Sequence, residues 1–193
     1  MTATEDQQLE HLRDLWQRNW PAGVSRDLRY SHGDGLITAY LEAAAREHPD
    51  RDAVIFYGHR TSFRELDDLS SRFAGFLQRA GVAPGDRVAV YMSNCPQFHV
   101  VVYGILKAGA VHVPINPMFK EAELRYEVED TDPVAIVTFE EFVPLVEQVR
   151  DPDTLRTVVV TTPAAMLPDE PEIPLHPTLE GAPREVTPDD AVA

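Results

Sequence analysis

The sequence has almost no cysteine, few basic residues and no long apolar run, and each shortage excludes a class of protein. Cys95 is the only cysteine among 193 residues, so no intramolecular disulfide can form. A disulfide-dense secreted domain is therefore excluded, and a reducing compartment is the natural one. We expect the protein to be cytoplasmic.

Positive charge is the second shortage. Lys and Arg total 17 against 32 Asp and Glu, which gives a formal net charge of −15. This balance argues against nucleic acid or an anionic bilayer as the main partner, because both attract basic surfaces. The first residues, Met1 to Asp6, are polar and acidic, unlike a signal peptide. No apolar run approaches the ~18 residues of a membrane span, so we expect no integral membrane segment.

What the sequence does contain is an alternation of β-type segments with amphipathic helical segments. Strands are expected near residues 53–57, 87–92, 111–115, 134–138 and 157–161, with helical patterns between them. This order predicts an α/β fold with a mainly parallel sheet flanked by helices. Residues 36–161 would form this core, residues 1–35 an N-terminal arm and residues 162–193 a linker.

The two flanking segments differ in composition from the core. In the arm, Leu9, Leu12, Leu15 and Trp16 recur at helical spacing and predict a short amphipathic helix. Because the arm carries two Trp, we expect it to pack against its own domain or against a second subunit, as in a homodimer. The tail has seven prolines between residues 163 and 188 and is acidic, which is typical of an extended linker.

Residues 106–117 read as the end of a helix, a turn and a short strand. Lys107 falls in the last helical turn, where a cation faces the negative end of the helix dipole. Gly109 stands where a helix needs a left-handed stop. Pro114 cannot donate a ladder hydrogen bond, so it belongs at a sheet edge or a strand end. Lys107 and Gly109 are predicted to be structural.

A hairpin and a capped helix are expected further upstream. Gly58-His59 is a plausible two-residue turn after strand 53–57. Ser62 and Glu65 form the pattern of a capping box that begins the next helix. The charged residues of that helix are expected to form its solvated face: Asp67, Asp68, Arg72 and Arg79.

Few residues indicate chemistry by themselves. The seven His do not cluster at metal-ligand spacing and no convincing Ser/His/Asp arrangement occurs, so neither a metal site nor a catalytic residue is predicted. His112, on a strand among valines, is expected to be a core or pocket-wall histidine. Cys95, before Pro96, is expected to be a buried small hydrophobe. No Walker pattern or Gly-Thr-Thr-Gly-like loop is present to bind a triphosphate.

Several motifs, in order along the chain, resemble those of the adenylate-forming synthetases. Residues 61–66, Thr-Ser-Phe-Arg-Glu-Leu, resemble the first core motif of that superfamily, usually Leu-Thr-Tyr-x-Glu-Leu. Residues 106–117 resemble the second core motif, and Ile115-Asn116-Pro117 resembles its form in CoA ligases. Three further segments match stretches around these motifs: residues 81–88, 94–98 and 123–126.

This resemblance implies the N-terminal subdomain of an acyl-CoA synthetase, most like the long-chain fatty-acid CoA ligases. Such an enzyme uses ATP and magnesium to form an acyl-AMP from a fatty acid or other carboxylic acid, and then passes the acyl group to coenzyme A. Asn116, Pro117 and Met118 would form part of the wall where coenzyme A enters.

The resemblance also implies that the ATP-binding loop of such an enzyme lies downstream of this chain. The chain alone would then be inactive, would bind none of these cofactors, and would have the remaining subdomains of its own chain as partners. Three alternatives stay open: an aryl- or other acid–CoA ligase, an adenylation domain of a peptide synthetase, or a non-catalytic α/β interaction module. Peptide-synthetase domains more often carry Asp where Asn116 stands.

Overall fold

The computed structural model of the protein describes residues 4–27 and 29–186. Leu28 of the predicted arm and residues 187–193 of the predicted linker lie outside the described residues. By its internal contacts the chain divides into two compact units, Met1–Gly35 and Leu36–Ala193. Each unit is described by itself below. None of the helices in the described parts is long and apolar enough to cross a membrane.

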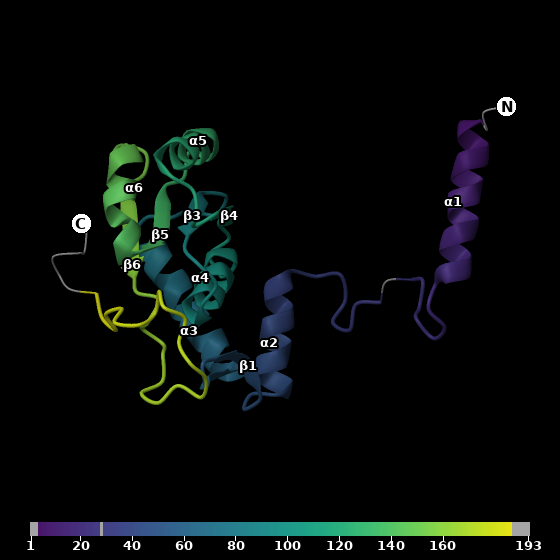
Figure 1. The fold of residues 1–193 in the computed structure, drawn as a ribbon, viewed down its shortest axis with the longest axis horizontal. Helices are drawn as coiled ribbons and strands as arrows, with labels where there is room; N and C mark the ends of the chain where they lie inside the picture. The colour runs from purple at the N-terminus through teal and green to yellow at the C-terminus, as the bar shows by residue number, and fades with distance from the viewer. Residues whose placement is uncertain (1–3, 28, 187–193) are drawn as a thin grey trace. The chain divides into compact units, whose positions relative to one another are not determined.

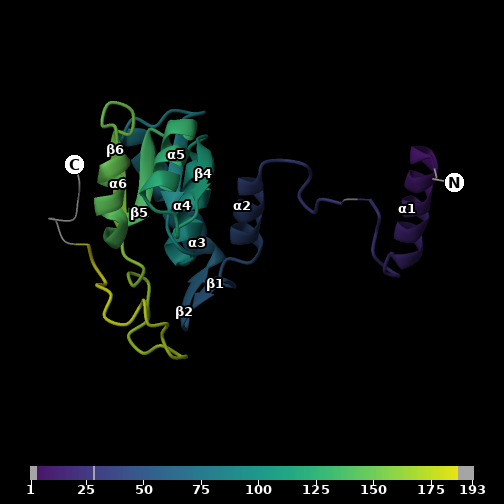
Figure 2. The ribbon, with the colours of Figure 1, turned by 45° about the horizontal axis from the view of Figure 1, so that its top comes forward.

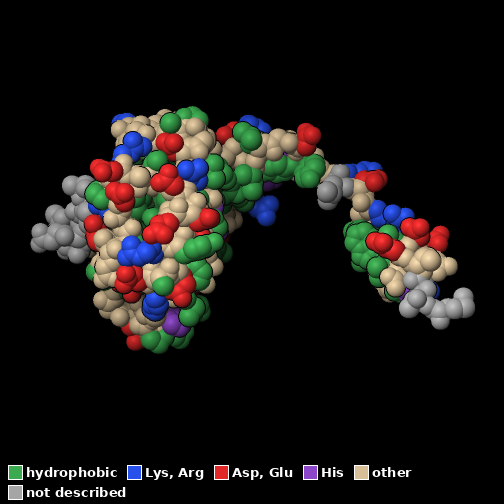
Figure 3. Space-filling model, turned by 90° about the horizontal axis from the view of Figure 1, so that it is seen from above, with side chains coloured by type: hydrophobic (Ala, Val, Ile, Leu, Met, Phe, Trp, Pro, Cys, Tyr) green, Lys and Arg blue, Asp and Glu red, His purple; other side chains and the backbone are tan. Residues whose placement is uncertain are grey.

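The first unit contains the predicted amphipathic helix, α1 (Glu5–Asn19). A capping interaction begins it, because the Thr4 backbone N–H donates to Gln7 Oε1 at 3.0 Å. No residue of α1 is buried, and its apolar side chains stay exposed, Trp16 by 72%. In Figure 3 hydrophobic side chains run along one side of this helix, with acidic side chains on the other.

The core of the second unit is the predicted parallel sheet. Its four strands are β3 (Arg87–Tyr91), β4 (Val111–Ile115), β5 (Ala135–Phe139) and β6 (Thr157–Thr161), in the spatial order β4-β3-β5-β6. All three strand pairs are parallel. The connections are helical: α4 (Pro96–Lys107), α5 (Glu121–Thr131), and the 3-10 turn η1 (Glu140–Phe142) with α6 (Val143–Val149). The predicted fold class is confirmed.

Two apolar layers cover the sheet, and strand alternation explains both. Val88 and Val90 face one side, where α3 (Phe63–Arg79) and α4 pack; Ala89 and Tyr91 face the other, where α5 and α6 pack. Figures 1 and 2 show these helix pairs flanking the strands. Pro114 lies on β4, an outer strand, which agrees with the predicted edge position.

The predicted strand at residues 53–57 does not join the parallel sheet. It forms β1 (Asp52–Phe56), which pairs antiparallel with β2 (His59–Ser62) in a separate two-stranded sheet. The cause is local, because Tyr57 and Gly58 have φ of 52° and 99°, the two left-handed residues of a tight hairpin turn. The turn therefore lies one residue earlier than the expected Gly58-His59. Helix α2 (Ile37–Glu47) precedes this hairpin.

Helices α3 and α4 lie unusually close to each other. Gly104 of α4 permits the approach, since a Cβ there would lie 2.6 Å from Phe73 Cδ1 and 2.9 Å from the Ser70 carbonyl oxygen. The predicted capping box of α3 is present, with Ser62 Oγ accepting from the Glu65 backbone N–H at 3.2 Å. Close helix packing of this kind makes the pair a rigid layer under the sheet.

A side-chain contact between the same two helices corrects one expectation from the sequence, that of Asp67, and adds to another, that of Lys107. Lys107 Nζ donates to Asp67 Oδ1 at 2.6 Å, to the Asp67 carbonyl at 2.8 Å and to Ser71 Oγ at 2.9 Å. Asp67 is therefore not part of the solvated face of α3, and Lys107 does more than meet a helix dipole. The error arose because a helix pattern shows which residues share a face, but not which neighbouring helix covers it. Gly109 has the predicted left-handed conformation, with φ of 76°.

Residues 162–186 lie against the core rather than apart from it. Ala164 and Leu167 are buried, and Arg184 Nη1 donates to the Leu167 carbonyl at 2.8 Å. Thr162 links this segment to itself and to the core. Its Oγ1 donates to the Pro183 carbonyl, and its carbonyl accepts from Gln97 Nε2 of α4 at 2.8 Å. These bonds bring the tail to the edge of the sheet where the strands end.

Candidate functional site

The topology of the sheet predicts where a ligand would bind. From β3 the chain crosses to β4 on one side, and from β4 it returns past β3 to β5 on the other side. Strands β3 and β5 are neighbours whose connections leave in opposite directions. In open α/β sheets, ligands bind in the crevice outside the carboxyl ends of two such strands.

A cleft of about 380 Å³ lies at this position. Its walls come from the segments that follow the strands: residues 93–95 after β3, Pro117 and Met118 after β4, and Phe139, Glu141 and Phe142 at the end of β5. The β1–β2 hairpin contributes Phe56 and Tyr57, and the tail contributes Pro163, Thr178 and Leu179. Six segments far apart in the sequence therefore meet around one space.

Aromatic rings form much of the cleft wall. Phe139 and Phe142 stack with ring centroids 6.1 Å apart, and Phe142 also contacts the buried Tyr91 at 4.8 Å. Phe56 and Tyr57, also in the lining, meet edge to face with ring centroids 4.9 Å apart. Such walls favour a flat or apolar group, which gains from burial and from ring contacts.

The charge of the cleft is negative. Glu141 is the one acidic residue of the described lining, and no Lys, Arg or His of the described residues lines it. Cys95 is neutral, because burial raises the pKa of its thiol to about 11. Burial and then the Glu141 carboxylate raise the pKa of the nearby Tyr91 phenol. No cationic side chain of the described lining is therefore available to pair with a phosphate group.

The three residues predicted to contact coenzyme A form a rigid turn at the rim. Asn116 is exposed, and its Oδ1 accepts from the Met118 backbone N–H at 3.0 Å. The Phe119 backbone N–H donates to the Asn116 carbonyl at 3.0 Å, and Tyr91 Oη donates to the Phe119 carbonyl at 2.6 Å. Pro117 and Met118 line the cleft, whereas Asn116 shapes the turn that holds them. Met118 is 79% exposed.

His112 and Cys95 lie where the sequence suggested, as wall or core residues. The His112 ring packs against Phe98 with centroids 6.1 Å apart, and burial lowers its pKa. Cys95 is buried at the start of α4. Phe56, Tyr57 and Glu141 also line the cleft and were not predicted from the sequence. The available signal was their position, since Glu141 lies two residues after the buried strand β5, Phe56 ends β1 and Tyr57 begins the turn after it.

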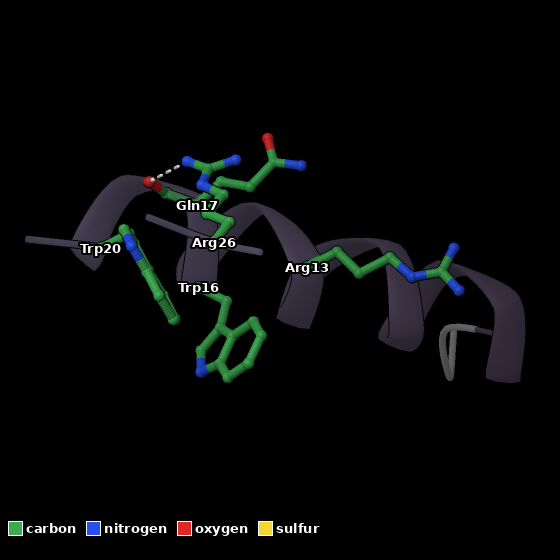
Figure 4. A pocket seen from close by; sticks show the side chains of 5 residues that line it. All are labelled: Arg13, Trp16, Gln17, Trp20 and Arg26. Carbon is green, nitrogen blue, oxygen red and sulfur yellow. Dashed lines mark hydrogen bonds between the residues drawn. The ribbon is translucent and has the colours of Figure 1, made fainter. Parts of the chain in front are cut away.

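A second hollow, in the arm, is lined by aromatic and cationic side chains of the kind found in binding sites, but these side chains do not converge. It measures about 200 Å³ and is lined by Arg13, Trp16, Gln17, Trp20 and Arg26. Arg26 Nη2 donates to the Gln17 carbonyl at 3.4 Å, while the Arg13 side chain extends away from the two indoles (Figure 4). The five side chains do not converge on one point, so we assign no site here.

An open parallel sheet with helices on both faces and a crevice at its switch point defines a ligand-binding α/β domain. The sequence profile of the AMP-binding enzymes matches residues 41–193. The chain belongs to this family.

Individual relatives agree with the family assignment. A long-chain-fatty-acid–CoA ligase of Haemophilus influenzae is 34% identical over 151 residues, which is 78% of this chain and 27% of the relative. A solved structure titled as a long-chain-fatty-acid CoA ligase of Rhodopseudomonas palustris superposes with a TM-score of 0.62 at 25% identity, covering 66% of this chain and 33% of that one. An anthranilate CoA ligase with anthranoyl-AMP superposes with a TM-score of 0.61 at 25% identity, over 64% and 24%. The chain thus spans about a quarter of the length of the curated relative.

Proposed function

We propose that this chain is the N-terminal part of an ATP-dependent acid–CoA ligase that acts on long-chain fatty acids in the cytoplasm. The observation that carries the proposal is the 34% identity to a long-chain-fatty-acid–CoA ligase over 78% of the chain. The reaction would form an acyl-AMP with release of pyrophosphate, and then transfer the acyl group to the thiol of coenzyme A. ATP, magnesium and coenzyme A would serve the complete enzyme.

In this proposal the described residues supply scaffold and wall rather than the reacting groups. The cleft lacks cations, so the charge that develops on a transferring phosphate would have to be stabilised by groups outside it. We also propose the division into an arm of residues 1–35, a core of residues 36–161 and a linker of residues 162–193. The linker would lead to the part of the enzyme that binds ATP.

The test of the main proposal starts from the gene. If its reading frame continues beyond Ala193 into a Gly-, Ser- and Thr-rich loop, the longer protein is purified and assayed for acid-dependent pyrophosphate release with a panel of fatty and aromatic acids. We expect long-chain fatty acids to give the highest kcat/KM. The 193-residue chain alone should show no ATP–pyrophosphate exchange above a no-enzyme control. A stop codon directly after Ala193, together with no acid-dependent pyrophosphate exchange, would support a non-catalytic module instead.

An aryl acid–CoA ligase is the second candidate, and the resemblance to the anthranilate CoA ligase structure favours it. The same acid panel distinguishes the two candidates, because a preference for benzoate-like acids over long-chain acids would replace the first by the second.

We further propose that Asn116, Pro117 and Met118 form part of the wall where coenzyme A enters. Support comes from the exposure of Asn116 and Met118 at the rim and from the rigid turn that the Asn116 side chain closes. In the longer enzyme, Asn116→Ala should raise the apparent KM for coenzyme A and leave the adenylation half-reaction unchanged. Met118→Ala serves as a second variant that leaves the Asn116 turn intact. If both half-reactions change equally, or neither changes, the assignment is wrong.

A further inference from the structure

The cleft at the sheet's carboxyl edge carries charge of the same sign as the three substrates of the proposed ligase. A fatty acid, ATP and coenzyme A are all anions, whereas the only charged side chain of the described lining is the Glu141 carboxylate. We propose that this cleft binds a flat aromatic group that carries an N–H donor, neutral or cationic, and that it rejects the corresponding anion. This inference does not depend on the ligase activity, because it concerns binding to the described residues alone.

Tyr57 provides the first argument that the cleft is built for a ring. Its φ of 52° lies in the left-handed region, which a bulky residue seldom adopts, and the first position of this hairpin turn favours Asn, Asp or Gly. Residues held in such conformations cluster at binding sites, where the side chain is needed despite the backbone cost. The Tyr57 ring lines the cleft beside Phe56.

The tail holds Tyr57 in this position. The Glu172 backbone N–H donates to the Tyr57 carbonyl at 3.0 Å, and the His176 backbone N–H donates to Tyr57 Oη at 3.4 Å. The tail also adds Pro163, Thr178 and Leu179 to the wall. The hairpin and the tail therefore fix one aromatic part of the lining, and the end of β5 fixes another through Phe139 and Phe142.

Glu141 provides the argument about charge. It lies two residues after the end of β5, in the short turn η1, and it is exposed at the cleft. A carboxylate beside aromatic faces attracts an N–H donor and repels an anion, and ring faces themselves favour cations over anions. The uncharged hydroxyl and amide of Ser93 and Asn94 offer hydrogen bonds on the same wall but do not offset the charge.

Three probes that share one ring and differ in charge test the proposal: benzylamine, benzamide and benzoate. Each is titrated into the ¹⁵N-labelled 193-residue chain, and NMR shifts give both the Kd and the amides affected. We expect benzylamine and benzamide to shift the amides of Gly58, Ser93 and Glu141. Benzoate should bind roughly three- to tenfold more weakly than benzamide, as expected for one like charge near a protein surface.

Three variants separate the effect of the Glu141 charge from that of the Tyr57 ring. Glu141→Gln keeps the side-chain shape, and it should bring the benzoate Kd to within about twofold of the benzamide Kd. Tyr57→Asn suits the turn, so its thermal midpoint should be no lower than that of the wild type, yet benzamide should bind roughly two- to tenfold more weakly. Tyr57→Phe keeps the ring and loses only the contact with the His176 N–H, so its affinity should match the wild type.

Each other result overturns the proposal. It is wrong if no probe shifts the cleft amides at its solubility limit, if benzoate binds as tightly as benzamide, or if Tyr57→Asn binds benzamide like the wild type. Fatty-acid activation by the longer enzyme would leave all three results unaffected, so failure here is distinct from failure of the proposed function.

Discussion

Replacing Lys107 tests whether a buried ion pair, rather than the helix dipole, joins α4 to α3. The ammonium group has three donors, and the structure satisfies all of them with Asp67 Oδ1, the Asp67 carbonyl and Ser71 Oγ. The Lys107 side chain is 10% exposed and that of Asp67 is 32% exposed. The pair therefore lies between a surface ion pair, which water screens, and a fully buried one.

The expected magnitude follows from that intermediate position. An exposed pair contributes about 0–1 kcal/mol, and breaking a fully buried pair costs about 3–5 kcal/mol. Because Asp67 keeps part of its hydration, we expect Lys107→Ala to lower the free energy of unfolding by about 2–3 kcal/mol. A dipole interaction alone would cost only about 0.3–1 kcal/mol.

The assay is urea unfolding followed by far-ultraviolet circular dichroism, applied to Lys107→Ala, Asp67→Ala and the double variant. The double-mutant cycle should give a coupling energy of about 1–2 kcal/mol, because the two residues share hydrogen bonds. Arg79→Ala is the matched control, since Arg79 is an exposed cation in the last turn of α3. The reasoning is refuted if the coupling is below about 0.3 kcal/mol, or if Lys107→Ala costs no more than Arg79→Ala.

Three further predictions concern single side chains. Gly109→Val should lower the free energy of unfolding by about 1–3 kcal/mol in the same urea assay, because φ is 76° there and a Cβ would lie 3.2 Å from Pro84 Cβ. Cys95 should react with a thiol-specific disulfide reagent far more slowly in the native chain than in urea, because its side chain is buried and burial raises its pKa to about 11. Burial lowers the pKa of His112, so below about pH 6.5 the unfolded chain takes up a proton that the native chain resists, and stability falls. His112→Phe should make this acid loss shallower, and equal pH slopes for the two proteins would contradict it.

The sheet could be predicted from the sequence because all its strands are short apolar runs and the two central ones, β3 and β5, are buried on both faces. Parallel strands of this kind are short apolar runs, and residues 87–92, 111–115, 134–138 and 157–161 all correspond to strands of the sheet. Residues 53–57 have the same composition but form a strand outside this sheet. The tight turn at Tyr57-Gly58 reverses the chain and pairs this strand with β2. A parallel neighbour would need a longer crossover connection, which the turn does not provide.

The site was harder to predict than the fold. Pro117 and Met118 could be proposed from a resemblance, but Tyr57 and Glu141 reach the cleft only through the arrangement of the hairpin, the sheet and the tail. Neither residue stands in a motif that indicates binding. The ion pair of Lys107 was missed for a related reason, since 40 residues separate it from Asp67 and only helix packing brings the two together.

The distribution of positive charge constrains how such a domain could take part in adenylation. Its two lysines are Lys107, whose ammonium is committed to Asp67 and Ser71, and Lys120, which is not among the residues that line the cleft. Two arginines in and after the hairpin are paired as well: Arg60 with Asp52 at 2.6 Å, and Arg64 with Asp50 at 3.0 Å. A cleft with a carboxylate and no free cation would repel a triphosphate rather than hold it. If the chain belongs to a ligase as proposed, the cations that balance the phosphate charge would have to come from outside the lining of this cleft.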